Sequence, residues 1–135
     1  MTTITTIERT ITMGLDQFAG SAPKGATINQ ELEWDAEFTW RKHPNLQGWM
    51  EALWKSKGLS TTGDWNEFNC NPVELSEEDI TCLRMDIESQ DLPKTSGFFF
   101  GENSDKEYKD QDLEFCKWAL KELKEGNKVI YDSWW

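Results

Sequence analysis

Residues 31–54, ELEWDAEFTWRKHPNLQGWMEALW, decide the fold because their apolar periodicity changes from two to helical at residue 44. Between residues 31 and 41, apolar side chains alternate with charged or polar ones, which is typical of a strand with one apolar and one charged face. Pro44 suits the first turn of a helix, the apolar residues that follow recur at helical spacing, and Gly58 offers a stop. The stretch therefore predicts a strand that leads directly into a helix.

The next segment predicts a second strand and a second helix. Residues 68–75 are typical of a short strand, which Pro72 keeps at a sheet edge or cuts short. Ser76 as the N-cap, with Asp79 three residues later, forms the best helix-start signal in the chain. The apolar stripe of this helix consists of Ile80, Leu83 and Ile87.

The C-terminal part of the chain completes the order of elements. Residues 92–101 predict either a short buried strand or a packed loop. Residues 113–123 predict a third helix, which Gly126 and Asn127 end, and residues 128–135 predict a last strand. This order predicts an α+β fold, in which a small, mostly antiparallel or mixed sheet packs against about three helices.

The length of 135 residues is that of one domain. Residues 1–30 differ from the rest, because they are rich in Thr, Ile, Gly and Ala, carry few charges and keep no single period. We therefore expect residues 1–30 to be an N-terminal extension, either a strand or an arm that is followed by a loop at residues 20–25, and residues 31–135 to be a single α+β domain. Deletion of residues 1–30 is then expected to leave a folded domain.

The net charge of −11, from 25 acidic and 14 basic residues, excludes several partners. Such a chain repels nucleic acid and anionic membranes and attracts a basic protein surface. No apolar run is long enough to span a membrane, and the N-terminus lacks the pattern of a secretory signal. Three cysteines without a C-x-x-C motif predict reduced thiols in a cytosol-like compartment, without a metal site or cofactor.

Eight tryptophans are more than one small core needs, and four of them are candidate binding residues. Trp40 and Trp49 bracket the run Arg41-Lys42-His43, and Trp134-Trp135 ends the chain. Arg41, Lys42 and His43 could hold an anion or a nucleotide phosphate at the strand–helix junction, with a base stacked on Trp40 or Trp49. The alternative is that the rings pack the core and the two cations pair with the abundant carboxylates.

His43 is the only histidine, and no nucleophile motif accompanies it. A role in capping the helix that begins at Pro44 is the alternative to a role in binding. The carboxylates offer many pairs, but none with a specific catalytic signature. The sequence therefore predicts no catalytic residue and favours a binding protein over an enzyme.

Glu31, Glu33, Asp35 and Glu37 put four like charges on one face of the first predicted strand, one every ~6.6 Å. Such a row repels itself unless solvent or a basic partner faces it. It could mimic a nucleic-acid backbone and face a basic protein. The alternative is a solvated face that protects an edge strand from pairing with other chains.

Four blocks of the sequence also point to a family. They are WRKHPNLQGWMEALW (40–54), FNCNPVELSEEDI (68–80), LPKTSGFFFG (92–101) and DLEFCKWALKELKEGNKVIYDSWW (112–135). Together they resemble a family of small tailed-phage accessory proteins over residues 38–135, a family without a settled function. Automated labelling often names such proteins phosphoglycerate kinase. That name does not fit, because this chain is too short for a two-domain kinase and has no glycine-rich phosphate loop.

The resemblance implies a non-enzymatic phage protein in the host cytoplasm that binds and inhibits a host factor, for example one in antiviral defence. The acidic row and the exposed aromatic residues would bind a host protein with a basic surface. The alternative is a small-molecule sponge that sequesters a nucleotide signal at the Trp40–Trp49 corner. In both cases we expect no direct DNA binding and no membrane insertion. The sequence leaves open whether the protein forms a homo-oligomer.

Overall fold

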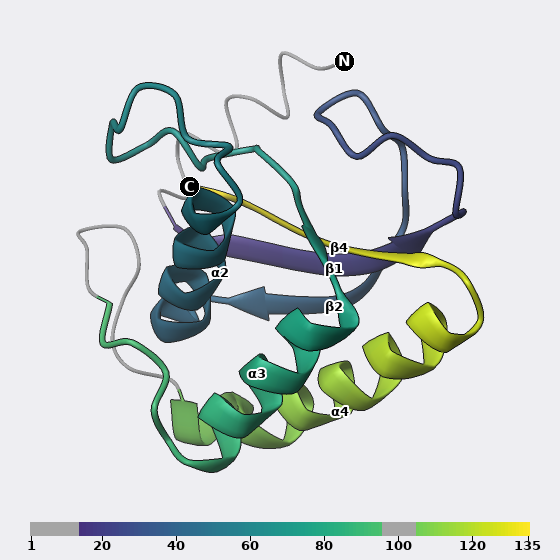
Figure 1. Ribbon diagram of the computed structural model, residues 1–135. Coiled ribbons are helices and arrows are strands. Elements are labelled where there is room, and N and C mark those ends of the chain that lie inside the picture. Colours follow the sequence, from purple (N-terminus) through teal and green to yellow (C-terminus); the bar gives the residue numbers. More distant parts are fainter. Residues whose placement is uncertain (1–13, 96–104) are drawn as a thin grey trace.

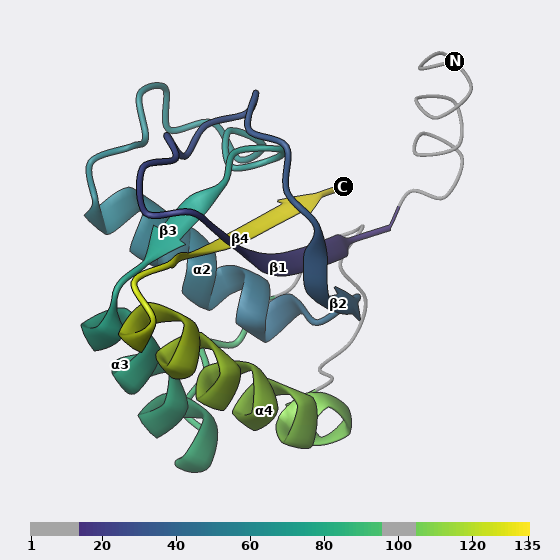
Figure 2. The same cartoon turned by 90° about the vertical axis from the view of Figure 1, so that its right-hand side faces the viewer.

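The computed structural model describes residues 14–95 and 105–135, which form four strands and three helices. In chain order these are β1 (Asp16–Ala22), β2 (Ala36–Arg41), α2 (Pro44–Ser56), β3 (Val73–Leu75), α3 (Glu77–Glu88), α4 (Asp105–Lys124) and β4 (Lys128–Trp134). The strands form one antiparallel sheet in the order β2-β1-β4-β3. The helices lie on one side of this sheet (Figures 1 and 2). The α+β fold predicted from the sequence is confirmed.

β1 is a central strand, because it pairs with β2 on one side and with β4 on the other. Residues 16–22, expected to be part of an N-terminal extension, therefore belong to the sheet, and no arm ends at residue 30. A strand was one of the two alternatives for this segment, but its position at residues 16–22 was not predicted, because the polar Gln17 is fully buried while its neighbour Phe18 is only half-buried. A chain without residues 1–30 loses the pairing partner of both neighbouring strands, so it is not expected to fold. Residues 1–13 lie outside the described part.

β2 begins at Ala36, five residues later than the alternating pattern predicts. Residues 34 and 35 instead approach β1 at Gly20, where a Cβ atom would collide with the carbonyl oxygen of Asp35 and lie 2.7 Å from the Trp34 ring. The pairing register of β1 and β2 also shifts between Ala19 and Gly20. The alternation of residues 31–35 thus reflects packing against the sheet, not membership of it.

The predicted helices α2 and α3 are confirmed with their end signals. α2 starts at Pro44, and Gly58 follows its end with a φ of +76°, a left-handed conformation that glycine adopts without strain. α3 begins with a capping box, in which Ser76 and Asp79 each accept a backbone N–H of the other. The apolar stripe of α3 is buried as predicted.

Other elements agree with the sequence less completely. The short strand expected at 68–75 is confirmed only as β3, which forms the sheet edge opposite β2 directly after Pro72. The last helix and the last strand are α4 and β4. Of the segment 92–101, residues 92–95 are irregular and the remainder lies outside the described residues.

The core between sheet and helices is rich in aromatic rings. Trp40 of β2 meets Phe115 of α4 edge to face, with ring centroids 5.4 Å apart, and lies 6.3 Å from the ring of Tyr131 in β4. Phe38 packs against the rings of Phe115 and Trp118 at 5.5 Å. These contacts fix α4 across β2 and β4. Within the described residues, no helix combines the length and apolar character that a membrane span requires.

Candidate functional site

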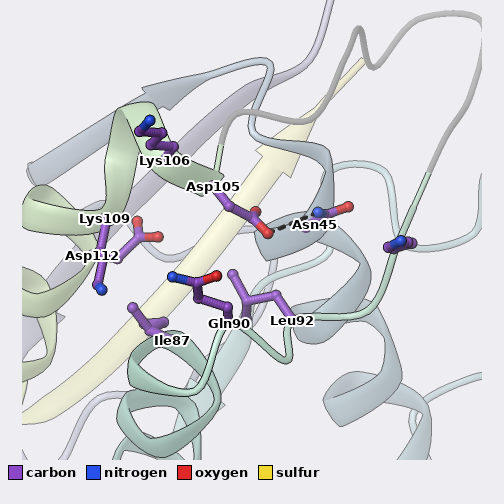
Figure 3. A pocket seen from close by; sticks show the side chains of 9 residues that line it. Asn45, Ile87, Gln90, Leu92, Asp105, Lys106, Lys109 and Asp112 are labelled. Atoms are coloured by element: carbon purple, nitrogen blue, oxygen red, sulfur yellow. Dashed lines mark hydrogen bonds between the residues drawn. The ribbon is translucent and has the colours of Figure 1, made fainter.

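A cavity of about 620 Å³ lies between the first turn of α2, the C-terminal end of α3 and the first two turns of α4 (Figure 3). Its volume is within the range of about 300–1,000 Å³ that is usual for small-molecule sites. It is lined by three lysines, two aspartates, two amides and two apolar residues: Lys94, Lys106, Lys109, Asp105, Asp112, Asn45, Gln90, Ile87 and Leu92. We call it the lysine cavity.

One face of α4 supplies the central residues of the cavity. Asp105, Lys109 and Asp112 follow one another at i, i+4 and i+7, so they share this face. Further along the helix the same face continues into the core as Phe115 and Cys116, which are both fully buried. The N-terminal half of α4 thus extends the core face with charged residues, and the cavity lies beside them.

Asp112 forms the floor of the lysine cavity and is 1% exposed. The indole N–H of Trp40 donates to its Oδ1 at 2.8 Å, and Nε2 of His43 lies 2.8 Å from its Oδ2. Burial raises the pKa of the Asp112 carboxyl above its ordinary value, while the hydrogen bonds from His43 and Trp40 act in the opposite direction. A buried carboxylate with hydrogen bonds to both oxygens holds β2, the β2–α2 junction and α4 together.

His43 is fully buried, and both its ring and its backbone contact neighbouring residues. Its ring stacks on Tyr108 with centroids 5.1 Å apart, and its Nδ1 lies 3.9 Å from Oδ1 of Asp105. The side chain of Gln17 accepts the backbone N–H of His43 at 2.8 Å and donates to its carbonyl at 3.1 Å. The predicted capping role is not what its side chain does: His43 occupies the N-cap position without a side-chain cap bond and pairs with Asp112 instead.

The predicted nucleotide corner therefore has a different structure from the one expected. Trp40 is 2% exposed and His43 is fully buried, so neither side chain can contact a ligand at the surface. Arg41 is exposed and forms an ion pair with Asp16 at 3.3 Å, and Lys42 beside it is exposed. Trp49 is half-buried against the core and donates its indole N–H to Asp86 at 2.8 Å. Core packing explains the two rings, as the alternative interpretation stated.

The C-terminal rings are also half-buried. Trp134 packs edge to face on Phe18 with centroids 5.2 Å apart and donates to Asp16 at 3.0 Å. Trp135 packs against the core. The tryptophan with the largest exposure is Trp65, at 66%, in the loop between α2 and β3. The sequence analysis did not single it out, because no periodic pattern surrounds it.

The four acidic residues of the predicted row are all exposed. Only Glu37 lies within β2, while Glu31, Glu33 and Asp35 precede the strand. They form an exposed acidic segment instead of one face of a strand. The regular spacing of a strand therefore does not apply to them.

The lysine cavity offers a ligand both charged and hydrogen-bonding groups. Its described lining has lysine ammonium groups for anions and carboxylate and amide oxygens for N–H donors. Across residues 14–95 and 105–135, no group of three His, Cys, Asp or Glu side chains could hold a metal ion. The arrangement favours a small ligand held by charge and hydrogen bonds.

Sequence reasoning missed the lysine cavity because its lining comes from three separate segments. The signal that was present is the spacing of Asp105, Lys109 and Asp112 on the face that becomes apolar at Phe115. Charged residues that continue an apolar helix stripe are candidates for a lined cavity, because they point toward the same side as the core.

Comparison of this chain with known proteins found no relative. No protein family, no curated protein and no solved structure matches this chain.

Proposed function

We propose that this protein binds a small anionic molecule in the lysine cavity and holds it without converting it. The observation that supports the proposal is the gathering of three lysines around one cavity in a chain that has only 14 basic residues against 25 acidic ones. Two of these lysines, Lys106 and Lys109, come from one helix turn and lie between the two aspartates in the sequence of α4. An anion that enters would meet a local excess of positive charge on an otherwise acidic protein.

Tight binding without turnover would make the protein a sponge. If the resemblance to tailed-phage accessory proteins holds, the setting is the cytoplasm of an infected host, where a sequestered signal molecule no longer reaches its receptor. This keeps the sponge predicted from the sequence and moves its site from the Trp40–Trp49 corner to the neighbouring cavity, which begins at Asn45.

Calorimetric titration of the full-length protein with pyrophosphate and with ribose 5-phosphate tests this function. We expect saturable binding that weakens as salt rises. Lys109→Gln should weaken it by about tenfold or more, because a hydrogen bond to a charged group is lost. The matched control is Lys117→Gln, which removes an exposed lysine of the same helix outside the cavity. If neither pyrophosphate nor ribose 5-phosphate bound, the proposal would be refuted. Phosphorus NMR after incubation would detect chemical conversion of a probe, which would contradict binding without conversion.

A second candidate function is the binding of a host protein with a basic surface. It is favoured by the exposure of Glu31, Glu33, Asp35 and Glu37 and by Trp65, an exposed ring of the kind that anchors interfaces. Retention of a host protein at low salt by the wild type, and its loss in a Glu33→Lys, Asp35→Lys variant, would support this candidate. Equal retention by both chains would refute the role of the acidic segment.

A further inference from the structure

A second hollow of the surface lies at the end of the molecule opposite α3 and α4. It is an open groove of about 370 Å³ that is lined by residues of the loop 23–35, between β1 and β2, and of the loop 57–72, between α2 and β3. Figures 1 and 2 show both loops at this end of the molecule. The lining combines apolar side chains with amides and a single carboxylate. We call this hollow the loop groove.

The apolar part of the loop groove is accessible from outside. Leu59 is 46% exposed, and Ile28 and Pro72 are half-buried. The ring of Trp54, which also lines the groove, is 4% exposed and belongs to the core. Leu59 and Trp65, two of the three most exposed large apolar side chains among the described residues, lie in the same loop. Exposed apolar side chains that gather in one region of a surface are typical of a protein-binding site.

Hydrogen bonds hold the two loops in place around the groove. The side-chain amide of Gln30 donates to Oδ1 of Asn71 at 2.8 Å and so joins one loop to the other. Nζ of Lys128 in β4 donates to the carbonyl oxygen of Ala26 at 2.7 Å. The carboxylate of Glu67 accepts backbone N–H groups within the second loop. A partner therefore meets a groove that is already formed, which lowers the entropy cost of binding.

The charge beside the loop groove is negative. Glu31 lines the groove, and Glu33, Asp35 and Glu37 follow it as the acidic segment 31–37. The stretch from residue 23 to residue 37 has four carboxylates against one lysine, Lys24. Within the part of the chain that the structure describes, none of these four carboxylates forms an ion pair. Lysine or arginine side chains of a partner are complementary to this surface.

We infer that the loop groove binds an extended segment of a basic partner, which places one apolar side chain against Leu59 and its lysines or arginines along the acidic segment 31–37. The inference rests on the second candidate function, the binding of a host protein, and specifies the contact on this chain. The groove and the acidic segment meet at Glu31, so one extended segment can reach both. Asn29 and Gln30 line the groove with exposed amides, which suit the backbone of such a segment.

The apolar contact would determine which basic partner binds. Exposed charges attract many basic surfaces, because they are screened by salt and do not require an exact fit. An apolar side chain gains affinity only where it finds an apolar surface to cover, so it fixes the position of the segment on this protein.

The test measures the binding of labelled ten-residue peptides to the full-length protein by fluorescence anisotropy. Each peptide has the same four basic residues and one variable position, occupied in turn by Leu, Ile, Val, Phe, Trp or Ser. We expect at least one apolar peptide to bind about fivefold or more tightly than the Ser peptide, because its side chain leaves water. Equal binding of all peptides would overturn the inference and leave the second candidate function intact. Failure of every peptide to bind would also overturn the inference, whereas the retention of a host protein by the wild type tests the candidate function separately.

Two variants locate the apolar and the basic contacts separately. Leu59→Ala should weaken the tightest apolar peptide by about fivefold and leave the Ser peptide unchanged. Its matched control is Met85→Ala, which shortens an apolar side chain of α3 that is 59% exposed outside the groove. Glu31→Gln should weaken both peptides by about twofold, the effect of one exposed ion pair, and Glu114→Gln of α4 should weaken neither. Equal effects of a variant and its control would overturn the placement of the segment.

The variants also test a different occupant of the groove. Analytical ultracentrifugation of the wild type and of Leu59→Ala measures self-association. We expect no difference between the two chains, and a wild-type dimer that Leu59→Ala dissociates would assign the groove to a second copy of this chain and overturn the inference. Thermal unfolding of each variant checks that it is folded.

Discussion

At the residue scale, Asp112 connects the stability of the fold with the candidate site. It accepts from Trp40 and pairs with His43 while 1% exposed. Asp112→Ala leaves a buried indole N–H and a buried imidazole without their acceptor, so we expect a loss of about 3–5 kcal/mol in the free energy of unfolding. Asp112→Asn keeps one acceptor oxygen and should cost less. Urea unfolding measures both, with the exposed neighbour Asp110→Ala as the control.

A small effect of Asp112→Ala on the free energy of unfolding would contradict this role of the Asp112 hydrogen bonds. If Asp112→Ala lost less than about 1 kcal/mol, the buried pair would contribute little to stability, because its desolvation would offset its hydrogen bonds. The shape of the cavity would then depend on the aromatic packing of Trp40 and Phe115 alone.

Glu67 organises the exposed loop between α2 and β3. Its carboxylate accepts from the side chains of Ser60 and Thr61 and from the backbone N–H groups of residues 61–63. The side-chain hydrogen bond from Thr61, followed by that from Ser60 and by the backbone bonds, lowers the pKa of Glu67 below its ordinary value of 4.5. A carboxyl with a lowered folded pKa contributes stability above its unfolded pKa and loses it as pH falls.

We therefore expect loss of loop order as the pH falls below the ordinary glutamate value. The amides of residues 61–63 should keep their protection from hydrogen exchange at about pH 5 and lose it progressively toward about pH 2, because the lowered pKa keeps the Glu67 carboxylate ionised until the pH is well below 4.5. Glu67→Gln should show weak protection already at the higher pH and little change between the two. Glu114→Gln, an exposed glutamate of α4, should behave like the wild type. Protection that is independent of pH in the wild type would contradict the role of the carboxylate.

At the scale of the element, β1 is constrained at Gly20 by residues that pack closely against it. Gly20 has no room for a Cβ atom beside the carbonyl of Asp35 and the ring of Trp34, whereas a Cβ at Gly25 would meet nothing within 4 Å. Gly20→Ala should lower the free energy of unfolding by about 1–3 kcal/mol through overpacking. Gly25→Ala should be neutral or slightly stabilising. Chemical unfolding of the two variants compares them directly, and equal stability would show that residues 34–35 move aside at no cost.

The same strand shows which kind of element local sequence patterns do not predict. The helices were predictable because each has local signals, such as Pro44 at the start of α2 and the Ser76–Asp79 capping box of α3. The position of β1 was not, because apolar and polar residues do not alternate along Asp16–Ala22, where the polar Gln17 is buried and Phe18 is only half-buried. The role of Gln17 depends on its hydrogen bonds to the backbone of His43, 26 residues away, which no local pattern reports.

At the scale of the whole molecule, the lysine cavity depends on packing between distant segments. Asn45, Lys94 and Asp112 meet only because α3 and α4 pack side by side below the sheet (Figure 2). The junction at residues 40–49, a site of interest in the sequence, contributes Asn45 to the cavity. Two of the candidate binding residues at this junction, Trp40 and His43, are buried, and their burial is a property of the assembled fold that no local pattern reports.

The distribution of charge over the whole molecule gives a last prediction, for the second candidate function. If the acidic segment 31–37 steers a basic partner, association must slow steeply as salt rises, because exposed charges are screened over about 8–10 Å at physiological ionic strength. Reversing Glu33 and Asp35 to Lys should slow association more than it accelerates dissociation and should leave the melting temperature unchanged. Stopped-flow association measures the rates.

The matched control reverses Asp110 and Glu114 to Lys, which changes the net charge equally at two exposed positions of α4. Slowing by the first pair alone would assign the steering to the acidic segment, because only local charge can distinguish two chains of the same net charge. Equal slowing by both pairs would mean that the net charge of −11 acts as a whole. An association rate that depends neither on salt nor on either pair of substitutions would make the segment a solubility feature and leave ligand binding in the lysine cavity as the remaining proposal.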